Sequence, residues 1–306
     1  MSARLPDPPA DRPRDPAPPA GARGPDLAVV VVNHDAGPYL ERCLRSVLAA
    51  AGGLSLEVVV VDNASTDGSE RAAELAGARL IRNPHNRGFS AAANQGIRAT
   101  SAPWVLLLNP DAEVWAGTLA ALLKRAEDDP RVAVVGPLLR NADGTVYPSG
   151  RRIPSLLDAV GHAFLAPFWP GNPFTRRYRI EDWDRTTERE VPWVSGAAML
   201  LRRRAVEEVG LLDEGYFLYF EELDLCTRLR ERGWRVLFTP ELEVLHEGGV
   251  STGRSRRMHL IHSRSAYRYF AKHRARGWRR ALLPLARAAL RARAELVALR
   301  DARRSR

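Results

Sequence analysis

The chain of 306 residues contains little cysteine, little lysine and no long apolar run. Its two cysteines, Cys43 and Cys226, are too few for a disulfide framework, and such low usage is typical of a reducing compartment. Only two of its 46 basic residues are lysine. No stretch of 18 apolar residues occurs, and no apolar core follows a basic start at the N-terminus. We therefore expect neither a transmembrane helix nor a secretory signal peptide.

Several motifs of nucleotide and metal chemistry are also missing. No G-x-G-x-x-G follows the first apolar run, which argues against a dinucleotide-binding Rossmann site. No G-x-x-x-x-G-K-[ST] is present, which excludes a P-loop. The C-x-x-C and H-E-x-x-H patterns of metal sites are absent as well. Any site chemistry must therefore come from residues that lie far apart along the chain.

Composition and charge divide the chain into three parts. Residues 1–26 hold eight prolines, with four arginines balanced by four aspartates, and this composition predicts a disordered tail. The formal net charge is +10, but 17 basic and only two acidic residues follow from Thr252 to the end. That end therefore carries +15 and the remainder −5. We expect a mildly acidic folded domain at 27–252 and a basic, helical extension at 253–306.

Apolar runs and helical patterns alternate from Leu27 onwards. Short buried strands are predicted at 27–32, 57–61, 78–81, 104–108, 132–135, 193–201 and 235–238. Helices are predicted at 39–51, 69–76, 89–99, 118–127 and 221–232. Residues 140–192, rich in Pro, Trp, Arg and Phe, have no sustained period and are interpreted as an irregular insert. This alternation predicts an α/β fold with a mostly parallel sheet flanked by helices.

Polar residues follow four successive predicted strands. These are Asn33-His34, Asp62-Asn63, Arg82-Asn83 with Asn86-Arg87-Gly88 beyond it, and Asn109-Pro110-Asp111. Ligands of open parallel sheets bind beyond the carboxyl ends of the strands. Asn, Asp and Pro also start turns and cap helices, which explains Asn33 and Asn83 singly. So many short polar side chains at one edge nevertheless favour a ligand site.

Asp111 and His246 are candidates for holding a metal ion. Asp111 follows the apolar run 104–108 closely, and Mg²⁺ typically binds one or two carboxylates together with substrate phosphate. His246 follows the last predicted strand and could be a further ligand. Asn-Pro-Asp is by itself a common turn, and a lone histidine is more often structural, so these alternatives stay open here.

Glu221, Glu222 and Asp224 begin a predicted helix. Favourable placement near the helix dipole explains such acids cheaply. The aromatic and aliphatic run 216–220 directly before them would desolvate a neighbouring carboxylate and raise its pKa. A raised pKa suits a general base, so this cluster is a candidate catalytic site.

The last predicted helix, 278–300, is basic and amphipathic. Its apolar stripe recurs with spacings of four, three, four and three residues, at Leu285, Ala289, Ala292, Leu296 and Leu299. A helix of this kind suits an anionic membrane surface. Packing of the stripe on the folded domain is the alternative. Aromatic residues among the arginines also leave a nucleic-acid-binding protein open.

Seven segments, in this order, resemble the family 2 glycosyltransferases, in particular their rhamnosyltransferase-like branch. They are VVVVNHDAGPYLERCLRSV (29–47), VVVVDNASTDGS (58–69), NPHNRGFSAAANQGI (83–97), LLLNPDAEV (106–114), VSGAAMLLRR (194–203), YFLYFEELDLCTRLRERGW (216–234) and LHEGGVST (245–252). The resemblance implies a GT-A type, Rossmann-like catalytic domain over 27–252, with 140–192 as an acceptor-side insert.

The resemblance also implies an activity. It is that of an inverting, metal-dependent glycosyltransferase, using Mg²⁺ or Mn²⁺, that moves a sugar from a nucleotide-diphosphosugar to a glycan or lipid-linked acceptor in cell-envelope or polysaccharide synthesis. Rhamnose is the first candidate for the sugar. We expect a cytoplasmic protein, with peripheral association at the inner face of the plasma membrane as an open alternative, and no nucleic acid partner. A sugar-phosphate nucleotidyltransferase would need G-x-G-T-R-L after the first strand, which is absent.

Roles for individual residues follow from the same resemblance. The implied donor-binding residues are Asn33, Asp62, Asn63, Asn86, Gly88, Asn94, Asn109 and Asp111, and the implied acceptor-side residues are Trp193, Ser195 and Gly196. Asp111 and His246 are the implied metal ligands. Glu222, which replaces the usual Asp, is the first candidate for the implied catalytic base, and Glu221 is the alternative. Asn109 likewise replaces the first acid of the D-x-D motif, which bears on the strength of metal binding.

Overall fold

The computed structural model describes residues 24–153, 165, 169, 171–180, 183–248, 255–275 and 277–304. Residues 1–23 of the expected disordered tail lie outside this range. So do parts of the expected insert, including 154–164. None of the described helices combines the length and the hydropathy needed to cross a bilayer.

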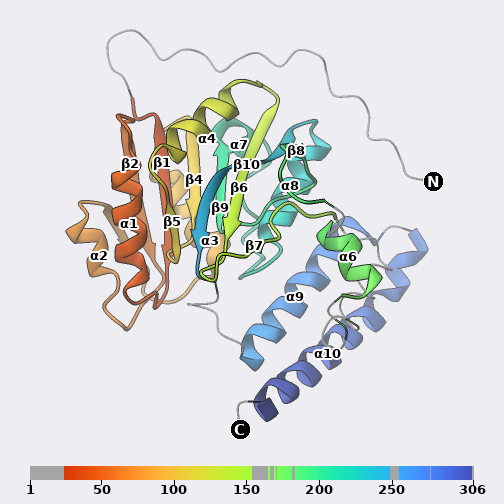
Figure 1. Ribbon diagram of the computed structural model, residues 1–306. Coiled ribbons are helices and arrows are strands. Elements are labelled where there is room, and N and C mark those ends of the chain that lie inside the picture. The colour runs from red at the N-terminus through yellow and green to blue at the C-terminus, as the bar shows by residue number, and fades with distance from the viewer. Residues whose placement is uncertain are drawn as a thin grey trace.

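One mixed sheet of ten strands forms the centre of the molecule (Figure 1). The strands are β1 (Leu27–Asn33), β2 (Leu56–Asp62), β3 (Arg79–Arg82), β4 (Trp104–Leu108), β5 (Ala112–Val114), β6 (Val132–Arg140), β7 (Val146–Tyr147), β8 (Arg189–Glu190), β9 (Ala198–Arg202) and β10 (Arg235–His246). Their order is β3-β2-β1-β4-β9-β6-β10-β5, with β7 on β6 and β8 on β10. The first four are mutually parallel, β9 is antiparallel to β4 and β6, and β10 is parallel to β6.

Helices cover both faces of this sheet. The described helices are α1 (Tyr39–Ala49), α2 (Arg71–Leu75), α3 (Phe89–Arg98), α4 (Thr118–Glu127), α6 (Pro173–Arg179), α7 (Arg203–Glu208), α8 (Glu221–Glu231), α9 (Arg256–His273) and α10 (Leu283–Arg304), with a 3₁₀ helix, η1, at Gly277–Leu282. Because successive side chains of a strand point to opposite faces, β1 contributes to two cores. Val30 belongs to the core that includes side chains of α3 and α8, and Val31 belongs to the core that includes side chains of α1 and α4.

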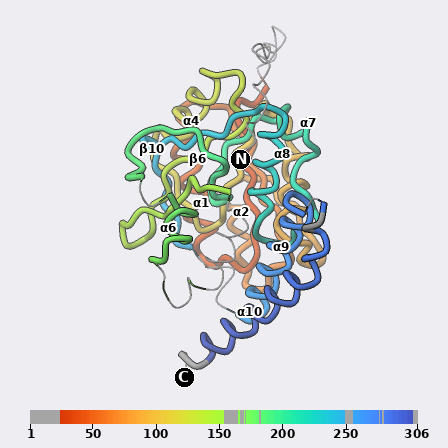
Figure 2. Tube along the Cα trace, turned by 90° about the vertical axis from the view of Figure 1, so that its right-hand side faces the viewer, coloured from red at the N-terminus to blue at the C-terminus, as the bar shows by residue number. Residues whose placement is uncertain are grey.

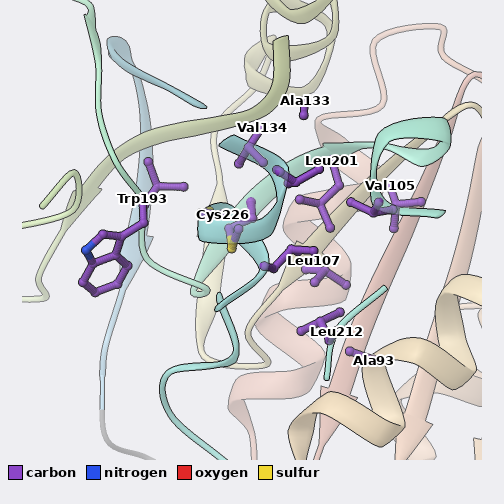
Figure 3. Packing of buried hydrophobic residues seen from close by; sticks show 14 of the residues in the cluster. Ala93, Val105, Leu107, Ala133, Val134, Trp193, Leu201, Leu212 and Cys226 are labelled. Atoms are coloured by element: carbon purple, nitrogen blue, oxygen red, sulfur yellow. The ribbon is translucent and has the colours of Figure 1, made fainter. Parts of the chain in front are cut away.

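The core between the sheet, α3 and α8 holds Cys226, which is fully buried (Figure 3). It lies among apolar side chains of β4, β6 and β9, such as Val105, Val134 and Leu201. Cys43 of α1 is equally buried in the other core, and both cysteines are free. These two thiols therefore act as small core residues.

The predicted α/β architecture is confirmed, and the differences concern element ends. The strand expected at 193–201 begins only at Ala198, and the last strand continues to His246 rather than ending at 238. The insert 140–192 is less irregular than expected, since it contains β7, α6 and β8. The short strand β5 was not predicted. It pairs with β10, and an edge strand of three residues has too little pattern to be recognised.

α9 docks on the domain formed by the sheet and its helices through a buried cluster around Asp224 of α8. The Asp224 carboxylate pairs with Arg228 at 2.7 Å, with Lys272 at 2.8 Å and with His273 at 2.7 Å. Tyr269 is fully buried nearby. α10 packs on α9, and its C-terminal half projects beyond the other described elements (Figure 2). The two helices of the basic extension therefore form a hairpin attached through α9.

Candidate active site

A cleft of about 610 Å³ lies at the carboxyl ends of the central strands. Polar residues from four strand ends and from the start of α8 line it together. Those named from the sequence are Asn63, Asn86, Gly88, Asn109, Asp111, Ser195, Gly196, Glu221, Glu222 and His246. Residues separated by up to 183 positions in the chain thus share one surface, as the strand-end pattern predicts.

One wall of the cleft is a loop held by asparagines. Asn83 donates from Nδ2 to Asn63 Oδ1 at 2.9 Å, and Asn63 donates from Nδ2 to the Gly88 carbonyl at 3.2 Å. Asn86 Oδ1 accepts from the Gly88 N–H at 2.9 Å. Gly88 has φ +84°, and a Cβ there would meet the Phe217 carbonyl oxygen at 2.6 Å. Only glycine allows this close approach of the loop to the segment before α8.

Asp111 and His246 meet because β5 pairs with the end of β10. Ala112 lies opposite His246 in that ladder, and His246 Nε2 lies 3.5 Å from Asp111 Oδ1. Asn109 Nδ2 lies 3.3 Å from the same imidazole nitrogen. The Gly248 N–H donates to Asp111 Oδ2 at 3.1 Å. Burial alone would raise the pKa of Asp111, but His246 and this backbone N–H hold that pKa below its usual range.

The Asp111–His246 pair fits a divalent cation that completes its coordination with phosphate oxygens. His246 presents Nε2 to the buried Asp111 carboxylate at 3.5 Å, so one nitrogen and one hard oxygen ligand face each other. Within the described ranges, no group of three or more His, Cys, Asp or Glu side chains could hold a metal by itself. Mg²⁺ commonly uses one or two carboxylates and takes its remaining oxygens from substrate and water.

Glu221 and Glu222 enter the cleft after a strained turn. Tyr219 and Phe220 have φ of +69° and +70°, a conformation that costs a non-glycine residue on the order of 1–3 kcal/mol. Helix α8 begins immediately after them. Glu222 packs against the backbone of Gly196, where an added Cβ would lie 3.9 Å from the Glu222 carboxyl carbon. The turn thus places both carboxyl groups at the cleft.

Both carboxyl groups are poorly solvated. The Oε2 atoms of Glu221 and Glu222 are buried without a hydrogen-bond partner. Burial raises the pKa of Glu222, and burial together with the charge of Glu222 raises the pKa of Glu221 well above its usual value. The shifts have the direction that the sequence predicts. Glu221 is the more enclosed of the two, with 6% of its surface exposed, whereas Glu222 is half-buried.

Arg151 lies behind Glu222 in a cage of aromatic rings. Its guanidinium carbon lies 5.0 Å from the ring centre of Tyr147, 5.8 Å from that of Tyr178 and 5.3 Å from that of Trp193. The positive charge of Arg151 favours the ionised form of Glu222 and so opposes part of the effect of burial on its pKa. Nothing in the sequence pattern marks this arginine, because 44 of the basic residues are arginine.

Four residues assigned from the resemblance do not line the cleft. Asn33 is fully buried and donates to Asp62 Oδ1 at 2.8 Å, while Asp62 also accepts from the Ser65 N–H. The Asn94 amide exchanges two hydrogen bonds with the backbone of Leu212. Trp193 is buried, and its indole N–H donates to the Arg152 carbonyl at 3.2 Å. In the structure these side chains support the cleft walls from behind.

Other residues line the cleft without having been assigned from the sequence. His34, Tyr147, Ser255, Arg257 and Met258 are among them. Tyr147 meets the His246 ring edge-on, with ring centres 5.9 Å apart. Ser255 caps α9 by accepting from the Met258 N–H, a pattern that predicts a helix start but not its position beside the cleft.

The chain matches a known protein family. The family described as glycosyl transferase family 2 matches residues 28–210, which is more than half of the chain. The chain belongs to glycosyl transferase family 2. This glycosyltransferase is 40% identical over 294 residues to the N-acetylglucosaminyl-diphospho-decaprenol L-rhamnosyltransferase of Mycobacterium tuberculosis, covering 92% of this chain and 95% of that protein.

More distant relatives agree with this assignment. Rhamnosyltransferase WbbL of Escherichia coli is 25% identical over 258 residues, covering 80% of this chain and 93% of that protein. The mannosyltransferase PcManGT of Pyrobaculum calidifontis, solved with GDP-Man and Mn²⁺, matches with a TM-score of 0.56 at 20% identity and covers 94% of this glycosyltransferase and 77% of that chain. GalNAc-T7, solved with UDP, GalNAc and Mn²⁺, matches with a TM-score of 0.56 at 17% identity. The match covers 82% of this glycosyltransferase and 51% of that chain. Both solved structures share the fold.

Proposed function

We propose that this glycosyltransferase transfers L-rhamnose from a nucleotide-diphosphosugar to an N-acetylglucosaminyl-diphospho-polyprenol, with inversion at the anomeric carbon. The observation that carries the proposal is the 40% identity, over nearly the whole of both chains, to the Mycobacterium tuberculosis enzyme whose name states this reaction. The cleft supplies the residues that such a transfer needs. The family assignment also favours this activity over that of a sugar-phosphate nucleotidyltransferase.

In this proposal different residues of the cleft bind the nucleotide diphosphate and hold the cation. The asparagine-held loop around Gly88 and the start of α3 bind the nucleotide diphosphate, since helix N-termini favour anions. Asp111 and His246 would hold a divalent cation, which would neutralise the charge that develops on the leaving diphosphate. Asn109 keeps the His246 ring in place through its amide.

Glu222 then accepts the proton of the acceptor hydroxyl as that oxygen attacks the anomeric carbon. It lines the cleft beside Gly196, and its desolvated carboxylate is a stronger base than an exposed one. The acceptor oxygen forms the new bond as the diphosphate leaves from the opposite face. The two events on opposite faces invert the configuration.

The direct test is a transfer assay followed by mass spectrometry. We expect the acceptor farnesyl-diphosphate-N-acetylglucosamine to gain one deoxyhexose from thymidine-diphosphate-rhamnose, and not from uridine- or guanosine-diphosphate sugars. Chelation with EDTA should stop transfer, and Mn²⁺ or Mg²⁺ should restore it, because Asp111 and His246 alone do not neutralise the diphosphate. A donor panel that yields no glycosylated product would refute the proposed activity, and full transfer in EDTA would refute the metal site.

We also propose that α10 holds the enzyme at an anionic lipid surface. Leu285, Leu296 and Leu299 are 70%, 64% and 58% exposed, whereas Ala294 on the opposite side of α10 is fully buried. Glu295 and Asp301 pair with Arg256 and His259 of α9. The leucine stripe therefore faces away from α9, which supports the membrane interpretation over packing on the domain.

A further inference from the structure

A second groove, of about 540 Å³, adjoins the active-site cleft along α9. The groove and the cleft share Phe217 and Arg257 as lining residues. Gly215 and Ser265 also line the groove. Phe217 also contacts Gly88 of the donor loop, so this one side chain lies between the groove and the donor site.

One face of α9 presents basic and apolar side chains to this groove. Arg257, Leu260, Ile261 and Arg264 line it, and their spacing of three, four and seven residues places them on the same side of the helix. The distance from the first to the last is about 10 Å along the helix. The face is therefore apolar in its middle and positively charged at both ends.

The two arginines differ from their neighbours in having no acidic partner. Arg256 forms a bidentate pair with Glu295 at 2.6 Å, and Arg268 pairs with Asp213 at 2.8 Å. No side chain of the described ranges pairs with Arg257 or Arg264. Two exposed, uncompensated guanidinium groups beside an apolar surface match an amphiphile with an anionic head.

We propose that this groove binds the diphosphate and the first isoprene units of the lipid-linked acceptor. The inference rests on the proposed function, since it needs a polyprenyl-diphosphate saccharide as acceptor. Arg257, at the junction with the cleft, and Arg264 bind the diphosphate, and Leu260 and Ile261 contact the isoprene units. The saccharide then extends across Phe217 towards Glu222.

Contacts of α9 also connect the groove to the turn that precedes Glu221. Ser265, which lines the groove, donates from Oγ to the Leu218 carbonyl at 2.7 Å. On the same helix, the His262 ring lies 5.3 Å from that of Tyr219 and 5.2 Å from that of Phe220. A lipid bound along α9 therefore contacts the helix that holds the strained turn in front of Glu221 and Glu222.

The test compares an acceptor that carries the diphosphate and isoprene units with one that carries neither. Farnesyl-diphosphate-N-acetylglucosamine and octyl β-N-acetylglucosaminide carry the same sugar, and the readout is the ratio of their kcat/KM values. Arg264→Ala should lower this ratio about tenfold or more, and Arg264→Lys should restore part of it. The paired substitution Arg45→Ala with Arg71→Ala removes two exposed arginines from α1 and α2 and should leave the ratio unchanged. An unchanged ratio in Arg264→Ala would overturn the proposal.

A binding measurement separates this proposal from the proposed activity. By calorimetry on the full chain, farnesyl diphosphate should bind at least tenfold more weakly to the double variant Arg257→Ala with Arg264→Ala than to the wild type. Farnesol and inorganic diphosphate should each bind the wild type more weakly than farnesyl diphosphate does. Equal affinity of wild type and variant overturns the groove even if transfer is observed. Arginine-dependent binding by a wild type that transfers no rhamnose supports the groove and refutes the activity.

Discussion

At the scale of single residues, the site depends on side chains whose surroundings are unfavourable to them. Tyr219 and Phe220 hold left-handed backbone conformations, and Glu221 and Glu222 each leave one buried carboxylate oxygen without a partner. Such features cost folding free energy and persist where the surrounding structure enforces them. Here the rings of Phe220 and Tyr269, with centres 6.0 Å apart, help to enforce the turn.

The pH dependence of transfer should report the environment of Glu222. Its carboxyl must be ionised to accept a proton, so kcat/KM should rise as pH rises through its pKa. Burial places that pKa above the usual glutamate value, and the charge of Arg151 lowers it in part. Arg151→Met should therefore shift the acidic limb of the pH profile to higher pH. Arg151→Lys, which keeps the charge, should leave it near the wild-type position.

The measurement is a pH series of kcat/KM for the three proteins at constant ionic strength. A general loss of folding would lower the rates at every pH and leave the limb in place. Coincident acidic limbs in Arg151→Met and the wild type would contradict this account of the Glu222 environment.

At the scale of elements, α9 connects the basic extension to α8, the helix that carries Glu222. It pairs with Asp224 through Lys272 and His273, and Thr227 of α8 lies 3.0 Å from the Tyr269 hydroxyl. Before Glu222, Ser265 of α9 donates to the Leu218 carbonyl, so α9 holds the segment on both sides of Glu222. Within the part of the chain that the structure describes, the larger contacts of α10 are with α9 and η1, and its opposite face is exposed.

The exposed leucines of α10 should govern binding to lipid. Replacing Leu285, Leu296 and Leu299 by serine removes the apolar stripe, so we expect much less protein to co-sediment with vesicles that contain anionic lipid. Serine at Leu75 of α2, which is 83% exposed, is the matched control and should not change co-sedimentation. Equal sedimentation of the triple variant and the wild type would rule out α10 as the anchor.

The sequence predicts elements well where packing and pattern coincide. The strands at Leu27–Asn33 and Trp104–Leu108 are fully buried runs, and a continuous apolar pattern identifies them. β9 was expected five residues too early, because Trp193 and Val194 are apolar yet belong to the segment before the strand. Burial alone does not specify a strand, and pairing with β4 and β6 sets its true start.

At the scale of the whole molecule, topology brings the site residues together. The strand-end pattern identified the cleft, and the resemblance supplied roles that the structure allows for Asp111, His246 and Glu222. The direction in which each side chain points could not be predicted from the sequence. Asn33 and Asn94 follow the pattern of donor-binding residues, but their amides donate to Asp62 and to the Leu212 carbonyl. The α9 contribution was missed because contacts over 40 or more positions leave no local pattern.

The central claim is that the cleft binds the donor through the loop around Gly88 and that Glu222 supplies the base. Glu222→Gln tests it most directly, in a transfer assay run beside calorimetry with thymidine diphosphate and Mn²⁺. Removing the base should lower kcat on the order of 10²- to 10⁴-fold, and nucleotide affinity should stay within about twofold of the wild type. Glu231→Gln, an exposed change at the end of the same helix, should alter neither. Transfer by Glu222→Gln near the wild-type rate would contradict the account.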